Sequence, residues 1–455
     1  MCSSNSSYTM KTLVILFILG LRNSGISYAS IIGYAGSFNV LDYGAAADGI
    51  TDDSQAFLNA WNDACSSAGG SPEVIIPPNM IFLLSPLTFR GPCNSENIYF
   101  VISGRLVAPS SPAIWTGEDA SQWLAFRNVS GLIVDGSGTI DGQGQGWWDQ
   151  SCRYHPDMVC HKIPDNSNST VTISNGPRVC RKQPLLLSPG RSKNCEGCTR
   201  LAPTALKFIF CSQSSISNIY FGNSAQTHIL IERCNGFKVD SVLIESPGNS
   251  PNTDGIHIQS SQYVAITNSK ISTGDDCISI GDYSSNVQIY NIQCGPGHGI
   301  SIGSLGKGGN FAQVENIHVS NAFFYGTTNG ARIKTWQVGR GYVRDVIFEN
   351  LEFNSVKNPI IIDQNYCDVR GACKEMVTGV QISNVIYQNI FGTSSTDIAI
   401  NLNCSMSVPC TDITMQLIQL TSATPGTTTQ GREVTAYCRN AYGQEYSIEP
   451  GPCIS

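Results

Sequence analysis

The sequence predicts an all-β chain that folds as a parallel β-helix, a solenoid in which each coil stacks on the coil before it. A short strand-like pattern recurs through the second half of the chain, in copies 23 to 34 residues apart. Repeats of 20 to 50 residues indicate stacked units that bury their apolar faces against one another. No stretch between the copies has the periodicity of an amphipathic helix, so coils of β-strands spaced ~4.8 Å apart fit best.

An Asn or Ser residue marks the same position in each copy of the repeat. We expect these side chains to form a ladder inside a bend, where they would satisfy buried backbone groups. The simpler alternative is that Asn only marks turns. The seven positions are Asn218, Ser241, Asn268, Asn291, Asn321, Asn350 and Asn384.

The composition excludes several classes of protein. Only 13% of the 455 residues are charged, whereas roughly 25% is usual, so a disordered polyelectrolyte and a coiled coil are excluded. A formal charge of -7 repels phosphate backbones, and we expect no nucleic-acid partner. The 18 cysteines are too many for a reducing cytosol and indicate an oxidising compartment.

The amino terminus predicts secretion. Lys11 precedes a nine-residue apolar run at 13–21, and Ser27 and Ala29 supply the small residues that a signal peptidase reads. We predict a signal peptide over residues 1–29 and a single β-helix domain over 30–455. The apolar run is too short to cross ~30 Å of hydrocarbon, so no membrane association is expected. Cleavage of the signal peptide would also remove Cys2. An odd number of cysteines would then remain, and at least one would lack an intrachain partner.

Sequons at Asn128, Asn168 and Asn403 predict glycosylation.

A short helix is predicted to cover the N-terminal end of the solenoid. Asp52 and Gln55 resemble a capping box, and the helix is expected over residues 52–65. Its apolar residues recur on one helical face. They are Ala56, Phe57, Ala60, Trp61 and Ala64.

Acidic, histidine and cationic side chains recur at one phase of successive coils. Asp254 precedes Asp276 by 22 residues, and Asp276 precedes His298 by 22 again. In a solenoid this spacing forms one column on adjacent coils. Asp275 joins the column because Gly274 indicates a local bulge. Carboxylates this close repel one another, so at least one should have a raised pKa and act as a proton donor. Hydrolysis of a glycosidic bond needs such an acid with a base.

Four motifs in this order resemble the polygalacturonases of glycoside hydrolase family 28, most closely the plant branch. They are SPNTDG at 250–255, GDDC at 274–277, GHGIS at 297–301 and RIK at 332–334. The resemblance runs from residue 38 to about residue 410. It implies a right-handed parallel β-helix that hydrolyses α-1,4 links between galacturonic acid units of pectin with inversion.

The resemblance also implies a role for each site residue. Asp275 would be the general acid, and Asp254 and Asp276 would hold and activate the water. His298 would orient and tune these carboxylates. The substrate-binding residues that it implies are Asn252, Arg332, Lys334 and Tyr366.

Cysteine spacing favours several local disulfides, although spacing alone does not establish a pairing. Cys277 and Cys294 lie on adjacent coils, and the family that the chain resembles pairs the equivalent two. The other candidate pairs are Cys65–Cys93, Cys367–Cys373, Cys404–Cys410 and Cys438–Cys453.

Residues 152–200 depart from the family pattern. They contain five Cys residues and have little β periodicity. Three interpretations stay open: a disulfide-tied loop near the rim of the cleft, a partly disordered insertion, or retained noncoding sequence. A loop that overhangs the cleft would restrict the enzyme to chain ends, so internal and terminal cleavage both remain open.

Three other functions remain alternatives to a hydrolase of homogalacturonan. A pectin lyase is also a β-helix, but it calls for calcium-binding carboxylates and an Arg base. A catalytically silent wall protein that binds pectin is the non-enzyme alternative, and a hydrolase or lyase of another pectic backbone is a third. We expect no metal, nucleotide or organic cofactor, and a monomer secreted to the cell wall or apoplast.

Overall fold

The computed structural model describes residues 36–112, 115, 119, 121–151, 158–162, 178–182, 202–367, 373–374, 376–423 and 433–454. The predicted signal peptide and most of the insertion at 152–200 lie outside the described residues. From Gly36 onward the chain forms one compact unit. Among the described residues, no helix is long and apolar enough to span a membrane.

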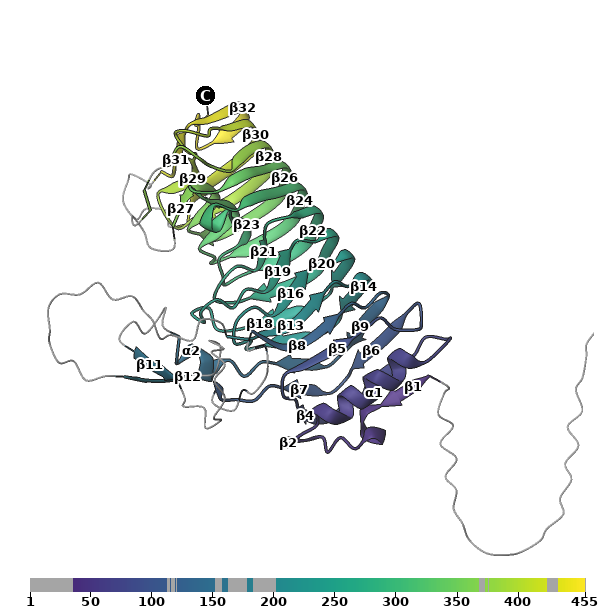
Figure 1. The fold of residues 1–455 in the computed structure, drawn as a ribbon. Coiled ribbons are helices and arrows are strands. Elements are labelled where there is room, and N and C mark those ends of the chain that lie inside the picture. The colour runs from purple at the N-terminus through teal and green to yellow at the C-terminus, as the bar shows by residue number, and fades with distance from the viewer. Residues whose placement is uncertain are drawn as a thin grey trace, which may run out of the picture. The chain divides into compact units, whose positions relative to one another are not determined.

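Parallel strands stack coil on coil, in chain order from the N-terminal to the C-terminal end of the solenoid (Figure 1). This arrangement confirms the predicted parallel β-helix. Two long sheets contain nearly all the described strands. The first sheet comprises β1 (Ser37–Asn39), β2 (Asp48–Asp52), β3 (Glu73–Ile76), β4 (Ile81–Leu83), β6 (Ile98–Ile102), β7 (Arg105–Val107), β9 (Leu132–Gly136), β10 (Thr139–Asp141), β14 (Ser212–Ser217), β15 (Tyr220–Gly222), β17 (Asn235–Asp240), β18 (Leu243–Glu245), β20 (Gln262–Ser272), β22 (Ser284–Cys294), β24 (Phe311–Tyr325), β26 (Arg340–Val356), β28 (Gln381–Ser394), β30 (Cys410–Ser422) and β32 (Ala441–Glu449).

The second sheet forms another wall of the solenoid. It comprises β5 (Leu87–Arg90), β8 (Gln122–Arg127), β13 (Thr204–Ile209), β16 (Ile229–Glu232), β19 (Ile256–Gln259), β21 (Ile278–Ile280), β23 (Ile300–Leu305), β25 (Asn329–Trp336), β27 (Asn358–Tyr366), β29 (Ile398–Asn403) and β31 (Thr435–Arg439). The described helices are η1 (Val40–Tyr43), α1 (Ser54–Ser66), α2 (Gln145–Trp148) and η3 (Lys307–Gly309).

The insertion has more β structure than its sequence predicted. Strands β11 (Met158–Lys162) and β12 (Arg178–Lys182) pair antiparallel in a sheet of their own. The three interpretations of the remaining insertion concern residues outside those described.

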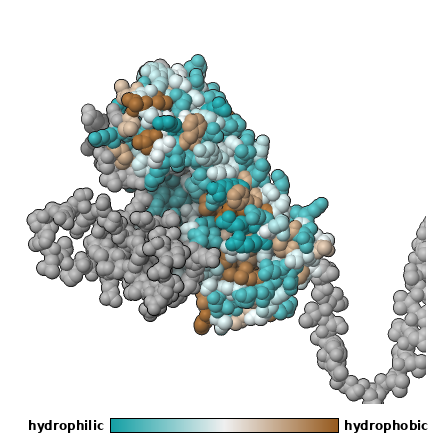
Figure 2. Space-filling model, viewed as in Figure 1, coloured by the Kyte–Doolittle hydropathy of each residue, from teal (hydrophilic) through white to brown (hydrophobic). Residues whose placement is uncertain are grey.

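Identical register from coil to coil builds the core. Apolar side chains at one position stack directly on one another and are almost completely buried, so each coil shields the next from water. One such stack runs through the first sheet as Val74, Phe100, Val134, Ile216, Val239, Ile266, Ile289, Val319, Phe348, Tyr387 and Met415. On the face shown in Figure 2, hydrophilic residues predominate and hydrophobic ones form small separate groups.

Helix α1 covers the N-terminal end of the stack, as predicted (Figure 1). The five apolar residues of its predicted face are all buried. Trp61 packs against Phe89, Phe100 and Phe126 with ring centroids 5.3 to 6.2 Å apart. The capping-box prediction is wrong, because the helix begins at Ser54 after Asp53, whose side chain makes no capping hydrogen bond, and the Gln55 side chain donates to Asn59.

The Asn ladder exists, but it lies on the outside of the bends and not inside them. The marked residues are exposed and have positive φ, for example +57° at Asn291. Asn tolerates this left-handed conformation better than most side chains. The amides bond to one another, as where Asn291 donates to the Asn268 side-chain oxygen at 2.8 Å. The bend turns the chain so that both Ile289 and Ile292 face the core.

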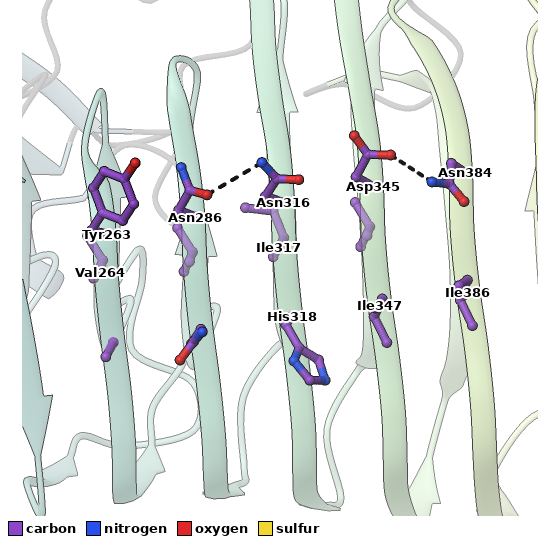
Figure 3. A pocket seen from close by; sticks show the side chains of 14 residues that line it. Tyr263, Val264, Asn286, Asn316, Ile317, His318, Asp345, Ile347, Asn384 and Ile386 are labelled. Carbon is purple, nitrogen blue, oxygen red and sulfur yellow. Dashed lines mark hydrogen bonds between the residues drawn. The ribbon is translucent and has the colours of Figure 1, made fainter.

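A second row of the same kind runs parallel to the first, which corrects one predicted position. Asn384 bonds to Asp345 in this second row (Figure 3). The residue that continues the first row beyond Asn350 is Asn389, whose amide donates to Asn350 at 2.7 Å. The sequence pattern misassigned Asn384 because each coil contains two similar bends, and the pattern does not say which bend a given Asn marks.

All five cysteine pairs that the sequence suggested are disulfides. Among the described residues, Cys211 and Cys234 are buried free thiols on adjacent coils. The odd cysteine expected after signal-peptide removal involves residues outside those described.

The bends predict a specific stability difference. Replacing Asn291 by Ala or by Gly removes the same side-chain amide, but only Gly accepts positive φ without strain. We expect Asn291→Gly to retain about 1 kcal/mol more stability than Asn291→Ala. Thermal unfolding midpoints of the two variants measure this difference, and equal midpoints would contradict the account.

Candidate active site

A cleft of about 530 Å³ brings together all eight residues that the sequence singled out. It lies along the second sheet, where the turns before β19, β21 and β23 meet β25 and the end of β27. The predicted lining residues are Asn252, Asp254, Asp275, Asp276, His298, Arg332, Lys334 and Tyr366. Residues that sequence reasoning did not select also line it, namely His257, Gln259, Ser279, Gly281, Asp282, Gly303, Ser304 and Cys367.

Coil register explains why residues 22 apart in sequence meet in space. Ile256, Ile278 and Ile300 are register partners in β19, β21 and β23. Asp254, Asp276 and His298 each lie two residues before one of these isoleucines, so they occupy one position in three successive coils. The predicted column is therefore present.

A close approach between coils places Asp275 beside the column. At Gly274, an added Cβ would lie 2.0 Å from the backbone oxygen of Ser250. Glycine is thus needed for this turn to lie against the preceding coil. Asp275 accepts on Oδ1 from its neighbour's backbone, the N–H of Asp276, at 2.9 Å.

Asp276 is an ionised carboxylate held by two cations. Arg332 Nη2 donates to Oδ1 at 2.6 Å, and Lys334 Nζ donates to Oδ2 at 2.9 Å. The Ser301 hydroxyl also donates to Oδ1 at 2.8 Å. Burial by itself would raise the pKa of Asp276, but Arg332 and Lys334 outweigh it and lower the pKa to about 2. Asp276 therefore cannot store a proton near neutral pH.

Asp254, in contrast to Asp276, favours its protonated form. Burial raises the pKa of Asp254 well above its ordinary value, and the nearby charges of Asp275 and Asp276 raise it further. Its Oδ2 lies 2.8 Å from the Ser279 hydroxyl oxygen. The sequence predicted that at least one crowded carboxyl would have a raised pKa, and the structure identifies Asp254.

Asp275 and His298 form a pair at the mouth of the column. The His298 Nδ1 atom lies 2.8 Å from Asp275 Oδ1, and the His298 backbone N–H donates to the Asp275 carbonyl at 2.7 Å. The Asp275 side chain is 11% exposed, compared with 2% for Asp276. Asp275 is therefore the more accessible of these two neighbours to a bound molecule.

Two aromatic rings lie between two lysines, and one of these, Lys334, also contacts the carboxylate of Asp276. The Lys334 Nζ atom lies 5.6 Å from the centre of the Tyr366 ring. Tyr366 packs edge-on against Trp336, with centroids 5.5 Å apart, and the Lys307 Nζ atom lies 5.1 Å from the Trp336 ring. We call Lys334, Tyr366, Trp336 and Lys307 the cation–aromatic row. Such a row suits a ligand with carboxylates and apolar ring faces.

Three side chains of the cleft could offer ligand atoms to a metal ion. Ligand atoms of Asp275, Asp276 and His298 lie within 4.8 Å of one another, close enough to share one ion. However, both oxygens of Asp276 already accept hydrogen bonds from cationic side chains. This set is therefore a poor cation site, and the absence of a metal cofactor stays a prediction.

Sequence reasoning missed the side chains that support the carboxylates. Ser279 and Ser301 are buried register partners, which bond Asp254 and Asp276 respectively. His257, which bonds Ser279, was not selected either. The available signal was periodicity: His257, Ser279 and Ser301 occupy the same outward position as Arg332 on successive coils.

The chain matches the family model described as glycosyl hydrolases family 28 over residues 65–183 and 186–441. It is 42% identical to the polygalacturonase QRT2 of Arabidopsis thaliana, over 85% of this chain and 79% of that protein. It is 41% identical to polygalacturonase-2 of Solanum lycopersicum, over 89% of this chain and 78% of that protein. The endo-xylogalacturonan hydrolase of Aspergillus tubingensis has the same right-handed β-helix fold, with a TM-score of 0.69 at 21% identity, covering 92% of this chain and 100% of that one.

The ion cluster predicts how stability depends on pH. Because the folded pKa of Asp276 lies below its unfolded value, its ionisation stabilises the fold above about pH 4, and this stabilisation is lost as pH falls toward 2. Asp276→Asn should therefore be less stable than wild type at pH 6. The gap should narrow by about 2 kcal/mol by pH 2.

Unfolding midpoints measured at both pH values check this expectation. Glu352→Gln, on an exposed part of β26, makes the same charge change outside the cleft and serves as the control. A gap for Asp276→Asn that stays constant with pH would contradict the ionised cluster.

Proposed function

The chain belongs to glycosyl hydrolases family 28, and from that premise we propose that its cleft hydrolyses the α-1,4-galacturonosidic bonds of homogalacturonan by an inverting acid–base mechanism. It is a glycoside hydrolase of the polygalacturonase type. The observation that carries the proposal is that a single cleft brings together the predicted carboxylates, histidine and cations, namely Asp254, Asp275, Asp276, His298, Arg332 and Lys334.

Asp275 is proposed as the general acid. Asp276 is excluded from this role because Arg332 and Lys334 keep it ionised. Asp275 lines the cleft, and its hydrogen bond with His298 fixes the orientation of the carboxyl group. In this role it protonates the glycosidic oxygen as the bond to the leaving sugar breaks.

Asp276 and Asp254 are proposed to act on the water. The Asp276 carboxylate is fixed on both oxygens and can orient a water molecule with its remaining lone pairs. Asp254 takes the proton as the water oxygen attacks the anomeric carbon. Asp254 must be ionised to do so, although burial and its acidic neighbours favour its protonated form.

Arg332 and Lys334 are proposed to bind a galacturonate carboxylate as well as Asp276. Two cations face one buried anion, which leaves one positive charge in excess at this point. A guanidinium also has donors beyond those used on Asp276 and Ser301. Tyr366 and Asn252 line the same cleft and complete the proposed substrate-binding set.

We place this enzyme outside the cell, as a secreted and glycosylated monomer of the cell wall. The proposal is supported by the five disulfides and by the signal peptide that the sequence predicts. Its substrate would be pectin, and neither nucleic acid nor membrane would be a partner.

The function is tested on de-esterified polygalacturonate with purified wild type and Asp275→Asn. We expect wild type to release reducing ends without a product that absorbs in the ultraviolet, and Asp275→Asn to lose at least ~100-fold in kcat. A fast fall in viscosity would indicate internal cleavage, and release of monomer alone would indicate action at chain ends. An ultraviolet-absorbing product would identify a lyase, and no product from folded wild type would favour the silent binder.

The cation–aromatic row predicts a dependence on chain length. Lys307→Gln should lower kcat/KM on long polygalacturonate about two- to fivefold, because one exposed charge contact is lost. The effect should fade at high salt. Lys270→Gln, exposed on β20 of the first sheet, is the matched control. Equal effects of the two substitutions would exclude a role for the row in binding.

A further inference from the structure

Two serines on neighbouring coils each bridge a basic side chain and a carboxylate. Ser301 accepts from Arg332 Nε at 2.8 Å and donates to Asp276 Oδ1 at 2.8 Å. Ser279 lies 2.7 Å from His257 Nδ1 and 2.8 Å from Asp254 Oδ2. Ser279 and Ser301 are register partners, so the two bridges are built at the same place in adjacent coils.

The two bridges differ in their basic member. Arg332 is a permanent cation, and the carboxylate that it reaches is permanently ionised. His257 can be neutral or charged near the working pH of an enzyme. The bridge from His257 to Asp254 can therefore exist in two protonation states, whereas the bridge from Arg332 to Asp276 has one.

The groups around His257 determine which atom donates and which accepts in its hydrogen bond with Ser279. The Gln259 amide donates through Nε2 to the Asp282 carbonyl at 3.2 Å, so its oxygen is left to accept from the His257 ring. A Cβ at Gly281 would lie 2.0 Å from that oxygen, and glycine there keeps the space for the amide. With one ring N–H given to Gln259, Nδ1 of neutral His257 has a lone pair and accepts from the Ser279 hydroxyl.

This direction of the hydrogen bonds requires Asp254 to carry a proton in the resting state. If the Ser279 hydroxyl hydrogen points to His257, its oxygen must accept from Asp254, and Asp254 must be protonated to donate. The raised pKa of Asp254 agrees with this assignment. Burial lowers the pKa of His257 and keeps it neutral at rest; of the charges near it, Asp276 raises that pKa and Lys334 lowers it. Its register partner on the other side, Leu230 of β16, has no charge.

We propose that His257 and Ser279 are positioning residues that draw the resting proton off Asp254 and so make it a base. The Asp254 O–H bond breaks as Ser279 takes that proton, and the Ser279 proton moves to Nδ1 of His257. Ser279 ends unchanged, Asp254 is a carboxylate and His257 is a cation. No proton is exchanged with solvent in this step.

The relay rests on the proposed function and supplies a step that the function requires. A neutral Asp254 cannot take a proton from water, and direct ionisation would place a second buried negative charge beside that of Asp276. The relay produces a positive charge on His257 at the same moment, so the net charge of the cleft does not change. Ser279 is the only hydrogen-bonded link to the Asp254 carboxyl recorded among the described residues.

The test compares pH profiles of kcat on oligogalacturonides. His257→Gln removes the proton acceptor, so Asp254 must ionise to solvent at its raised pKa, and the acidic limb should move up by about one pH unit or more. His257→Arg supplies a permanent cation, so its acidic limb should lie below that of His257→Gln. Ser279→Ala should behave like His257→Gln, and Ser279→Thr, which keeps the hydroxyl, should return toward wild type.

Folded wild-type activity is the first requirement, because an inactive wild type would overturn the proposed function and not the relay alone. The relay itself is overturned if wild type is active while Ser279→Ala keeps the wild-type profile. It is also overturned if the Gln and Arg variants of His257 share one profile. His318→Gln, a histidine change on β24 outside the cleft, should leave the profile unchanged, and unfolding midpoints identify any variant that has lost its fold.

Discussion

Strand register between coils is the constraint on which this structure depends. Each strand of the solenoid pairs with the equivalent strand one coil away, so a residue's position along the coil determines its neighbours in space. Within the core this produces stacks such as Ile266, Ile289 and Val319. At the cleft, the same register brings functional groups that lie one coil apart in sequence next to one another. Register between coils therefore determines both the packing of the core and the arrangement of the site.

The same rule creates the electrostatic problem of the cleft. Stacked coils force Asp254, Asp275 and Asp276 together, and three carboxylates at this separation cannot all ionise at little cost. Two of the carboxyl groups, those of Asp276 and Asp254, accommodate this repulsion in different ways. Arg332 and Lys334 compensate Asp276, whereas Asp254 favours its neutral form. A solenoid suits this arrangement because a compensating cation one or two coils away projects into the same column.

Register also explains what could be predicted from the sequence. The β-helix and the column of carboxylates follow from periodic spacing, and the covering helix follows from its apolar face, all of which a single sequence displays. Cysteine spacing suggested the disulfides without establishing them. Asn252 and Tyr366 were implied only by the family resemblance. The hydrogen bonds of Arg332 and Lys334 to Asp276 could not be predicted in this way. Spacing places a side chain on a face of the solenoid, but it does not determine which group that side chain contacts. The exposure of the Asn ladder was also missed, since the reason for Asn is the left-handed bend and not the satisfaction of buried groups. Asn384 was placed in the wrong row because two bends in each coil share one pattern.

An acidic chain that acts on a polyanion must bind by local contacts. The formal charge of -7 opposes long-range attraction, but charges beyond about 8 Å are largely screened at physiological ionic strength. Within that distance the cleft presents Arg332 and Lys334 against one committed carboxylate, and Lys307 lies further along the cation–aromatic row. If Asp254 is neutral at rest, the cleft has one negative charge fewer when the substrate carboxylate arrives. Protonation of Asp254 would thus favour binding, and its ionisation would be needed only after the substrate is in place, which gives the relay through Ser279 its place in the order of events.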